Sequence, residues 1–449
     1  MIIRHFVMSL SITVLSLNAF AAPSQSTHEF TLDNGLKVVV REDHRAPVIV
    51  SQLWYKVGSS FEAPSSTGLS HALEHMMFKG SSKAGAGEAS QILSNLGVQE
   101  NAFTSDDVTV YYQVLAKDRL PIALELEADR MATLKIPADE FAKEIEVIKE
   151  ERRLRTDDNP NALAYERFRS LAYPASGYHN PPIGWRADLD RMSVEDLRAW
   201  YKRWYAPNNA VLVLVGDITL EEAKKQANHW FGHIPRQPDI VTKKPLELAN
   251  PGDRKLNIHV KAQLPTLLMG FNVPSLSTAE NKRDAYTLEL IAALLDGGNS
   301  ARLTTELELK QELVTGAGAG YSAVTRGDTL FIFNALPNTQ KGKNIAEVEK
   351  GIWQLLDQLK TTKPTKEELD RVKAQLIASL VYSRDSISSQ AMMIGTLEAV
   401  DLPWQLYDKE LEEIEAVTPE DIQRVAKKYF TKDRLTTAYV LPEEENKND

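Results

Sequence analysis

The pattern of apolar and polar positions predicts a chain that mixes β-strands with helices. Apolar residues alternate or run continuously where strands are expected and recur at helical spacing elsewhere. In chain order, the expected elements are a hairpin with an Asn-Gly turn at 30–40, a β run at 48–57, helices from 68 to 155 interrupted by strands at 102–115, a capped helix at 193–204 and an apolar strand at 210–215.

The same order of elements returns in the second half of the chain. Ser193-Val194-Glu195-Asp196-Leu197 matches Thr418-Pro419-Glu420-Asp421-Ile422, and the apolar strand that follows returns at the same distance, at 435–440. Residues 47–59 likewise resemble 265–275. Because solenoid repeats are only about 20–50 residues long, this single long repeat predicts a tandem pair of similar domains.

A linker is expected between the two copies. Residues 234–252 hold four prolines and show little periodicity, which is typical of a domain boundary. We therefore expect an N-terminal domain over 22–233, a linker over 234–252 and a C-terminal domain over 253–449.

The first 21 residues have the pattern of an export signal. Arg4 precedes an apolar stretch at 6–17, and Ala19-Phe20-Ala21 is a small-x-small cleavage site. An uncleaved anchor is the alternative, but a spanning helix needs about 20 apolar residues. We expect cleavage near Ala21/Ala22 and export to a bacterial periplasm, with no membrane span in the mature chain.

Composition removes several classes of function. The 449 residues carry 52 Lys+Arg, 62 Asp+Glu, 43% hydrophobic residues and no cysteine. These fractions are typical of globular proteins, and the net charge of −10 argues against a nucleic-acid binder. Without cysteine there is no disulfide, thiolate metal site or cysteine nucleophile. Any metal site must therefore use histidine and carboxylate ligands.

Residues 67–80 carry the clearest candidate chemistry. A helix is expected here, with Ser and Thr residues as N-terminal caps and Gly80 as its C-terminal stop. Its apolar positions, spaced to form one buried stripe, are Leu69, Ala72, Leu73 and Met76.

His71, Glu74 and His75 lie on a neighbouring face of this helix and form an H-x-x-E-H motif. The two imidazoles are one turn apart, so both can reach one metal ion, while Glu74 lies beside a metal-bound water without being a ligand. This is the inverted zinc-protease motif. It supplies two nitrogen donors and a general base that passes a proton from water to the leaving amine.

The motif and the following Met77–Ser81 resemble the pitrilysin (M16) family of zinc metallopeptidases, especially the half-length branch of mitochondrial processing peptidase and bacterial paired peptidases. Further similar segments are Asn101–Ser105, Asn208-Asn209, Gly216-Asp217 and Leu295–Leu303. The resemblance covers essentially the whole mature chain. It implies an α+β fold of two homologous domains, each a mostly antiparallel sheet packed against helices.

The resemblance also implies the rest of the site, built around one Zn²⁺ per chain. Aligning Val147-Ile148 with the family's apolar pair selects Glu151 as third ligand and places Glu144 beside the site as a partner of the ligands. The strand holding Asn101, Ala102 and Phe103 is implied to bind substrate backbone by β-addition. The alternatives are a solvated charged helix and an ordinary strand.

The remaining histidines are interpreted as structural. His229 and His233 are also four residues apart, but no carboxylate stands between them and the helix ends there. His44, His179 and His259 are isolated and have the same interpretation.

The second half departs from the family pattern. It has no H-x-x-E-H motif, as is normal for the family's C-terminal domain, but many members place an Arg and a Tyr there to stabilise the oxyanion. The alignment puts Glu308 and Thr315 at those two positions, and neither can do this. We therefore expect a second, homologous subunit to supply this half of the site. The sequence leaves open whether the chain forms such a heterodimer or a homodimer, and a fully active homodimer would argue against the divided site.

The leading hypothesis is an exported zinc endopeptidase that acts on peptides or unfolded segments. One alternative is a non-catalytic core-type subunit, against which the intact His71, Glu74, His75 and Glu151 argue. Another is a peptide-binding subunit with structural zinc, but structural zinc usually has four protein ligands and only three are evident.

Overall fold

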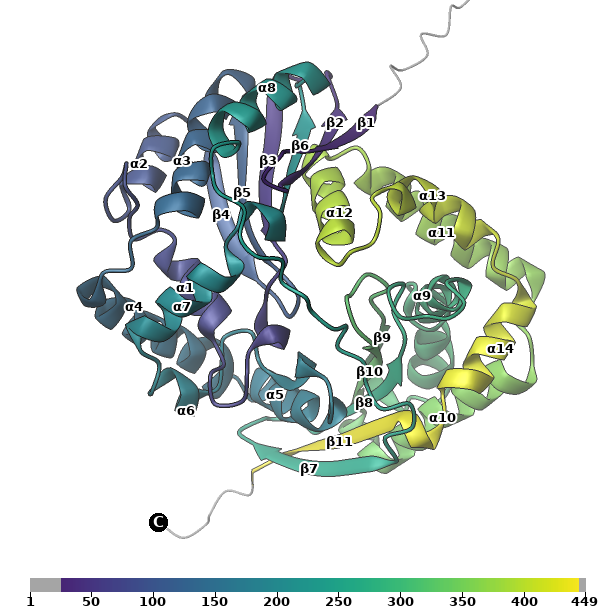
Figure 1. The fold of residues 1–449 in the computed structure, drawn as a ribbon. Coiled ribbons are helices and arrows are strands. Elements are labelled where there is room, and N and C mark those ends of the chain that lie inside the picture. Colours follow the sequence, from purple (N-terminus) through teal and green to yellow (C-terminus); the bar gives the residue numbers. More distant parts are fainter. Residues whose placement is uncertain (1–25, 444–449) are drawn as a thin grey trace, which may run out of the picture.

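The computed structural model describes residues 26–443, so the predicted export signal at 1–21 lies outside the described residues. Two β-sheets organise the chain (Figure 1). The first runs in the order β1 (Thr27–Thr31), β2 (Lys37–Glu42), β6 (Ala210–Gly216), β3 (Val48–Tyr55), β5 (Thr109–Ala116), β4 (Gln99–Thr104). The second runs β7 (Arg254–Val260), β11 (Leu435–Pro442), β8 (Thr266–Val273), β10 (Thr329–Pro337), β9 (Val314–Gly320).

The two sheets confirm the predicted duplication. The order β2-β6-β3-β5-β4 in the first returns as β7-β11-β8-β10-β9 in the second. In each sheet the first of these pairs is parallel and the other pairs are antiparallel. The hairpin strand β1 extends only the first sheet. The fold is therefore α+β with two homologous domains, as the sequence predicts.

Helices cover both sheets. Those of the first half are α1 (Leu69–Met76), α2 (Glu88–Asn95), α3 (Leu120–Thr133), α4 (Ala138–Arg152), α5 (Pro160–Ala172), α6 (Arg186–Leu189), α7 (Val194–Trp204) and α8 (Leu220–Phe231). Those of the second half are α9 (Arg283–Asp296), α10 (Ile345–Thr361), α11 (Lys366–Ser383), α12 (Ile387–Ala399), α13 (Gln405–Glu415) and α14 (Pro419–Tyr429). None of the helices within 26–443 has the length and apolarity needed to cross a bilayer.

The predicted helix caps repeat as well. Ser193 caps α7 and Thr418 caps α14, each through a reciprocal pair of hydrogen bonds with an aspartate three residues on. Between α8 and β7, residues 232–253 form no helix or strand.

The two halves exchange helices across their sheets. The first sheet packs one face against helices of its own half, while the other face, including Val50 and Trp54, joins the core of the second half. Helix α12 lies on that face, against β3 and β6 (Figure 1). Gly395 of α12 permits the approach, because a Cβ there would lie 2.1 Å from the Trp54 ring.

The exchange is reciprocal. Helix α5 from the first half packs on the second sheet, against β7, β8 and β11. Its Phe168 is fully buried and lies over Gly270, where a Cβ would stand 2.7 Å from the ring. Because each sheet needs a helix from the other half to cover it, the two domains interlock, and α5 lies between the two sheets beside the candidate site.

Candidate active site

Helix α1 presents the H-x-x-E-H motif as its sequence predicts. Leu69, Ala72, Leu73 and Met76 form the buried stripe. His71, Glu74 and His75 are half-buried on the neighbouring face. The apolar stripe therefore sets the rotation of the helix, and this rotation turns His71 and His75 toward α4 and Glu74 toward β4.

Two expectations about the ends of α1 are wrong. No Ser or Thr side chain caps the N-terminus; Gly68 occupies that position in a left-handed conformation. The Glu62 carboxyl group accepts hydrogen bonds from the Gly68 and Ser70 N–H groups, both at 2.7 Å, so a residue outside the helix satisfies the free donors. The helix ends at Met76, and a turn separates it from Gly80, so Gly80 is not the residue that stops the helix.

Glu151 of α4 completes a cluster with the two histidines. Its Oε2 lies 3.4 Å from His75 Nε2 and 3.8 Å from His71 Nε2. Around a tetrahedral zinc with bonds near 2.0–2.1 Å, ligand atoms lie about 3.3 Å apart. Within residues 26–443 this is the one group of three or more such side chains close enough to share a metal. Its two imidazoles and one carboxylate fit a zinc ion.

The neighbouring Glu150 points away from this cluster. It is exposed and pairs with Arg153 at 2.6 Å. The buried positions Phe141 and Ile148 set the rotation of α4, which brings Glu151 to α1 and leaves Glu150 in solvent. The two glutamates are distinguished by packing.

The imidazoles differ in their surroundings. Burial, helped by His75 and Arg155, lowers the pKa of His71 to about 3, so this ring is neutral at ordinary pH. His71 Nδ1 is buried without a hydrogen-bond partner among the described residues. His75 Nδ1, in contrast, has a hydrogen-bond partner, Glu144 Oε1, at 2.9 Å.

Lys79 extends this contact into a chain of three side chains. Its Nζ lies 2.5 Å from Glu144 Oε2. Burial tends to raise the pKa of Glu144, but Lys79 and His75 outweigh it and lower that pKa. The anionic Glu144 then orients the His75 ring with Nε2 toward the cluster. Sequence reasoning missed Lys79, although its position four residues after His75 was a usable signal.

Glu74 does not belong to the three-residue cluster. Its Oε2 accepts a hydrogen bond from the Thr104 hydroxyl at 2.5 Å. Burial raises the pKa of Glu74, although Thr104 and His75 oppose this. A carboxyl group with a raised pKa beside a candidate metal site is suited to accept a proton and to return it.

Thr104 ends β4, the strand expected to hold substrate. β4 pairs with β5 on one side and is an edge strand of the first sheet, so no strand of the described residues pairs with its other edge. Asn101 is exposed and Ala102 is partly buried. Phe103 packs edge to face on Trp54, with ring centroids 6.0 Å apart, so it also serves the core.

A cavity of about 290 Å³ opens beside the cluster. His71, Thr104 and Glu151 line one side of it. Arg155 also lines it and contacts Glu151 Oε1 at 2.7 Å. Arg155 lies in a π-helical segment, Arg153–Asp157, that continues α4. Such segments often mark functional sites.

The other histidines differ in their distance from the candidate site. His229 and His233 are exposed at the end of α8, and His44 pairs with Asp217 at 2.6 Å. His179, however, lines the cavity beside His71 and Glu151, so the structural interpretation missed its position. The turn that carries His179 is distant in sequence, and no local pattern links it to the motif.

Two family models match the chain. The model described as Insulinase (Peptidase family M16) matches residues 37–182, and that described as Peptidase M16 inactive domain matches 191–376. The chain is 30% identical to zinc protease PqqE of Helicobacter pylori, over 97% of each chain. It is 26% identical to the uncharacterized zinc protease YmxG of Bacillus subtilis, over 90% of this chain and 96% of that protein.

Solved structures share the fold. A protease from Helicobacter pylori superposes with a TM-score of 0.86 at 30% identity, covering 93% of this chain and 100% of the other. An M16 inactive domain from Pseudomonas fluorescens gives 0.82 at 20% identity, over 93% and 98%. The periplasmic protease PqqL of Escherichia coli gives 0.77 at 19% identity, over 94% of this chain and 48% of that chain.

Proposed function

Because the chain belongs to peptidase family M16, we propose that it is an exported zinc-dependent endopeptidase that hydrolyses peptides or unfolded polypeptide segments. The observation that carries this proposal is the convergence of His71, His75 and Glu151 with Glu74 beside them. The zinc-protease names of the relatives support the same chemistry.

In this mechanism His71, His75 and Glu151 hold the metal. When bound, zinc supplies a Lewis acid that lowers the pKa of a water molecule and polarises the scissile carbonyl. Glu74 accepts the proton of the attacking water and returns it to the leaving amine. The Thr104 hydroxyl holds the Glu74 carboxylate in place, and Glu144 orients His75.

The edge of β4 receives the substrate in this proposal. A peptide that adds to the strand at Asn101, Ala102 and Phe103 uses main-chain hydrogen bonds, which accept many sequences. Its scissile bond then lies near Thr104 and Glu74, which are in direct contact.

A partner completes the site in the same proposal. Glu308 and Thr315 stand where an arginine and a tyrosine are expected, and neither lines the cavity beside the zinc cluster. A homologous M16-like subunit that carries the arginine and the tyrosine supplies those side chains, because a second copy of this chain would bring the same Glu308 and Thr315. The chain spans about half of PqqL, whose length is consistent with two such units.

The proposal includes processing and export. Residues 1–21 are removed, and the mature chain has an N-terminal peptidase domain at 22–233, a linker at 234–252 and a C-terminal domain at 253–449. The periplasm is the proposed location, which the name of the structural neighbour PqqL supports.

The test compares Glu74→Gln with wild type and with Glu150→Gln, a control that removes an exposed charge from α4. We expect one zinc per chain in all three proteins. Only Glu74→Gln should lose cleavage of a quenched peptide, by about 10²–10⁴-fold. Normal cleavage by Glu74→Gln would exclude the general-base role, and a wild type without zinc would exclude the enzyme.

The partner is tested with the same assay. The chain is measured alone and after addition of a homologous subunit that carries the arginine and tyrosine. Full activity of the purified chain as a homodimer would contradict the divided site. Zinc binding without cleavage under every pairing would favour a peptide-binding subunit.

A further inference from the structure

The cavity beside His71, His75 and Glu151 lies at the end of β4, the proposed substrate strand. Thr104, the last residue of β4, lines it together with His71 and Glu151. Helix α5 and the turn near His179 form the opposite wall. Side chains of an extended peptide point alternately to either side of its backbone. A peptide paired with β4 therefore directs a side chain close to the scissile bond into this cavity.

The acidic groups of the cavity wall are already paired. Glu166 accepts two hydrogen bonds from Arg152, both at 2.8 Å. Arg152 is buried and also donates to the Gly184 carbonyl at 2.7 Å. Glu151 directs Oε2 to the histidines and Oε1 to Arg155. Neither carboxylate is available to bind a basic side chain.

Arg155 is a cation with unused hydrogen-bond donors. Its side chain is 76% exposed, and within residues 26–443 its one ion pair, through Nη1, is with Glu151. An arginine has five N–H donors in a planar fork. The contact uses the oxygen of Glu151 that faces away from the histidines, so it persists when the other oxygen binds a metal.

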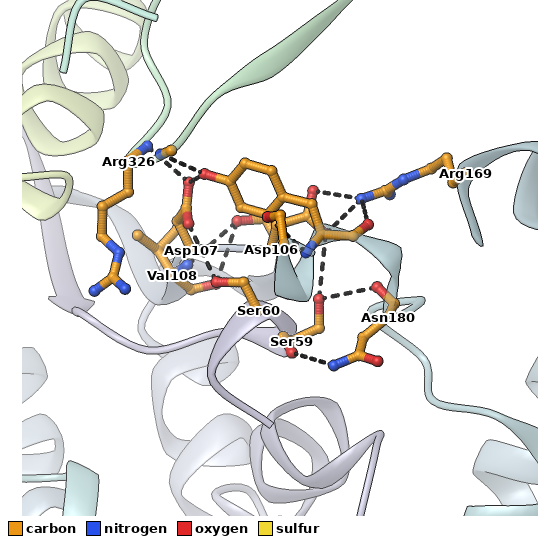
Figure 2. A network of polar contacts seen from close by, with 12 residues as sticks. Ser59, Ser60, Asp106, Asp107, Val108, Arg169, Asn180 and Arg326 are labelled. Atoms are coloured by element: carbon orange, nitrogen blue, oxygen red, sulfur yellow. Dashed lines mark hydrogen bonds and ion pairs between the residues drawn. The ribbon is translucent and has the colours of Figure 1, made fainter. Parts of the chain in front are cut away.

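Arg169 adds a second and better-fixed cation. Its Nη2 donates to both oxygens of Asp106, at 2.9 and 3.0 Å, and to the Tyr178 carbonyl at 2.6 Å. Figure 2 shows Arg169 directed at Asp106 within a larger polar network. Among the described residues its Nε and Nη1 make no hydrogen bond or ion pair, while the guanidinium lies 5.7 Å from the centre of the Tyr173 ring. Arg169 also lines a larger cavity of about 1150 Å³ against the second sheet.

From these charges we infer that the cavity selects substrates with an acidic side chain, Asp or Glu, next to the scissile bond. Arg155 and Arg169 are the residues that determine this specificity. A substrate carboxylate can accept charge-assisted hydrogen bonds from the donors that these two guanidinium groups leave unused, whereas the carboxylates beside them, Glu151 and Asp106, already have these guanidinium groups as partners. The inference rests on the proposed peptidase function and specifies its substrate class.

The experiment uses zinc-loaded full chain and quenched peptides that differ at one residue. Glu, Gln or Lys is placed on each side of the cleaved bond in turn. We expect Glu to exceed Gln in kcat/KM by about ten-fold on one side, as for a hydrogen bond to a charged group. Arg155→Gln should reduce this ratio to near one, and Arg155→Glu should favour Lys. Each ratio comes from a single preparation, so incomplete zinc loading does not affect it.

Arg153→Gln is the matched control. Arg153 lies in the same π-helical segment, is exposed and does not line the cavity. It should keep the wild-type preference. Equal cleavage of the Glu and Gln peptides by wild type would overturn the inference and leave the proposed peptidase intact.

A binding measurement separates the two hypotheses if wild type cleaves no peptide. Fluorescence anisotropy of labelled Glu and Gln peptides is recorded on zinc-loaded Glu74→Gln, with and without Arg155→Gln. Tighter binding of the Glu peptide that disappears with the second substitution supports the acidic pocket. Equal binding, or none, overturns it.

Discussion

At the scale of single residues, the proposed zinc ligands are supported by cations behind them. Glu144 contacts His75 on one side and Lys79 on the other, and Arg155 contacts the far oxygen of Glu151. Such partners fix the orientation of a ligand and raise its affinity for metal. Glu144 and Glu151 therefore each have a cationic partner, Lys79 and Arg155, whether or not a metal is bound.

Lys79→Met should therefore weaken zinc binding by about 10–100-fold, because Glu144 loses the cation that pairs with it and holds it in position. Competition with a chromophoric chelator measures the affinity. Lys79→Arg should restore most of it. Lys83→Met is the control. It removes a lysine that lies four residues after Lys79 and pairs with Glu125, and it should leave zinc affinity unchanged. An unchanged affinity in Lys79→Met would show that Glu144 needs no cation.

At the scale of elements, helices α9 and α14 are joined by a buried carboxylate. Asp284 of α9 accepts hydrogen bonds from Arg424, Lys428 and Tyr429 of α14, at 2.6, 3.1 and 2.8 Å. Burial opposes ionisation of Asp284, but the three donors outweigh it and hold its pKa below the usual range. Replacing the carboxylate by an amide removes the charge and one of the two acceptor oxygens, so donors that now share both oxygens lose a partner.

Asp284→Asn should lower the free energy of unfolding by about 3 kcal/mol at pH 7. A lowered pKa contributes stability above the unfolded-state pKa, about 3.9, and this contribution is lost as the pH falls through the folded-state value. The difference between wild type and variant should therefore shrink below about pH 4. Urea unfolding across this range measures it. Asp357→Asn, at an exposed pair, should have almost no effect.

At the scale of the whole molecule, we expect the exchanged helices to make the two domains unfold as one unit. Helix α12 covers the first sheet and α5 covers the second, each through a glycine at the point of closest approach. A side chain at either glycine would press on a fully buried ring, Trp54 or Phe168.

Gly395→Ala and Gly270→Ala should each destabilise the protein by about 2 kcal/mol or more, because the added methyl overpacks a buried contact. Thermal unfolding should stay a single transition with a lower Tm, since both halves share these contacts. Gly320→Ala, where a Cβ meets nothing within 4 Å, is the control and should be neutral. Two separate transitions in either variant would contradict the interlocked arrangement.

By itself, the sequence determined the features that depend on local spacing. His71, Glu74 and His75 share a helix face because they lie within about one helical turn. The caps at Ser193 and Thr418 repeat because each depends only on hydrogen bonds to a residue three positions further along the chain. The duplication was visible for the same reason, since each copy repeats its local pattern.

Only the tertiary structure decided what depends on packing between distant segments. The rotation of α4 against α1 brings Glu151 rather than Glu150 to the histidines. The fold also places Arg155 and His179 in one cavity and exchanges α5 and α12 between the sheets. Hydrophobic periodicity states which face of an element is buried but not which partner covers it, because apolar contacts are non-directional.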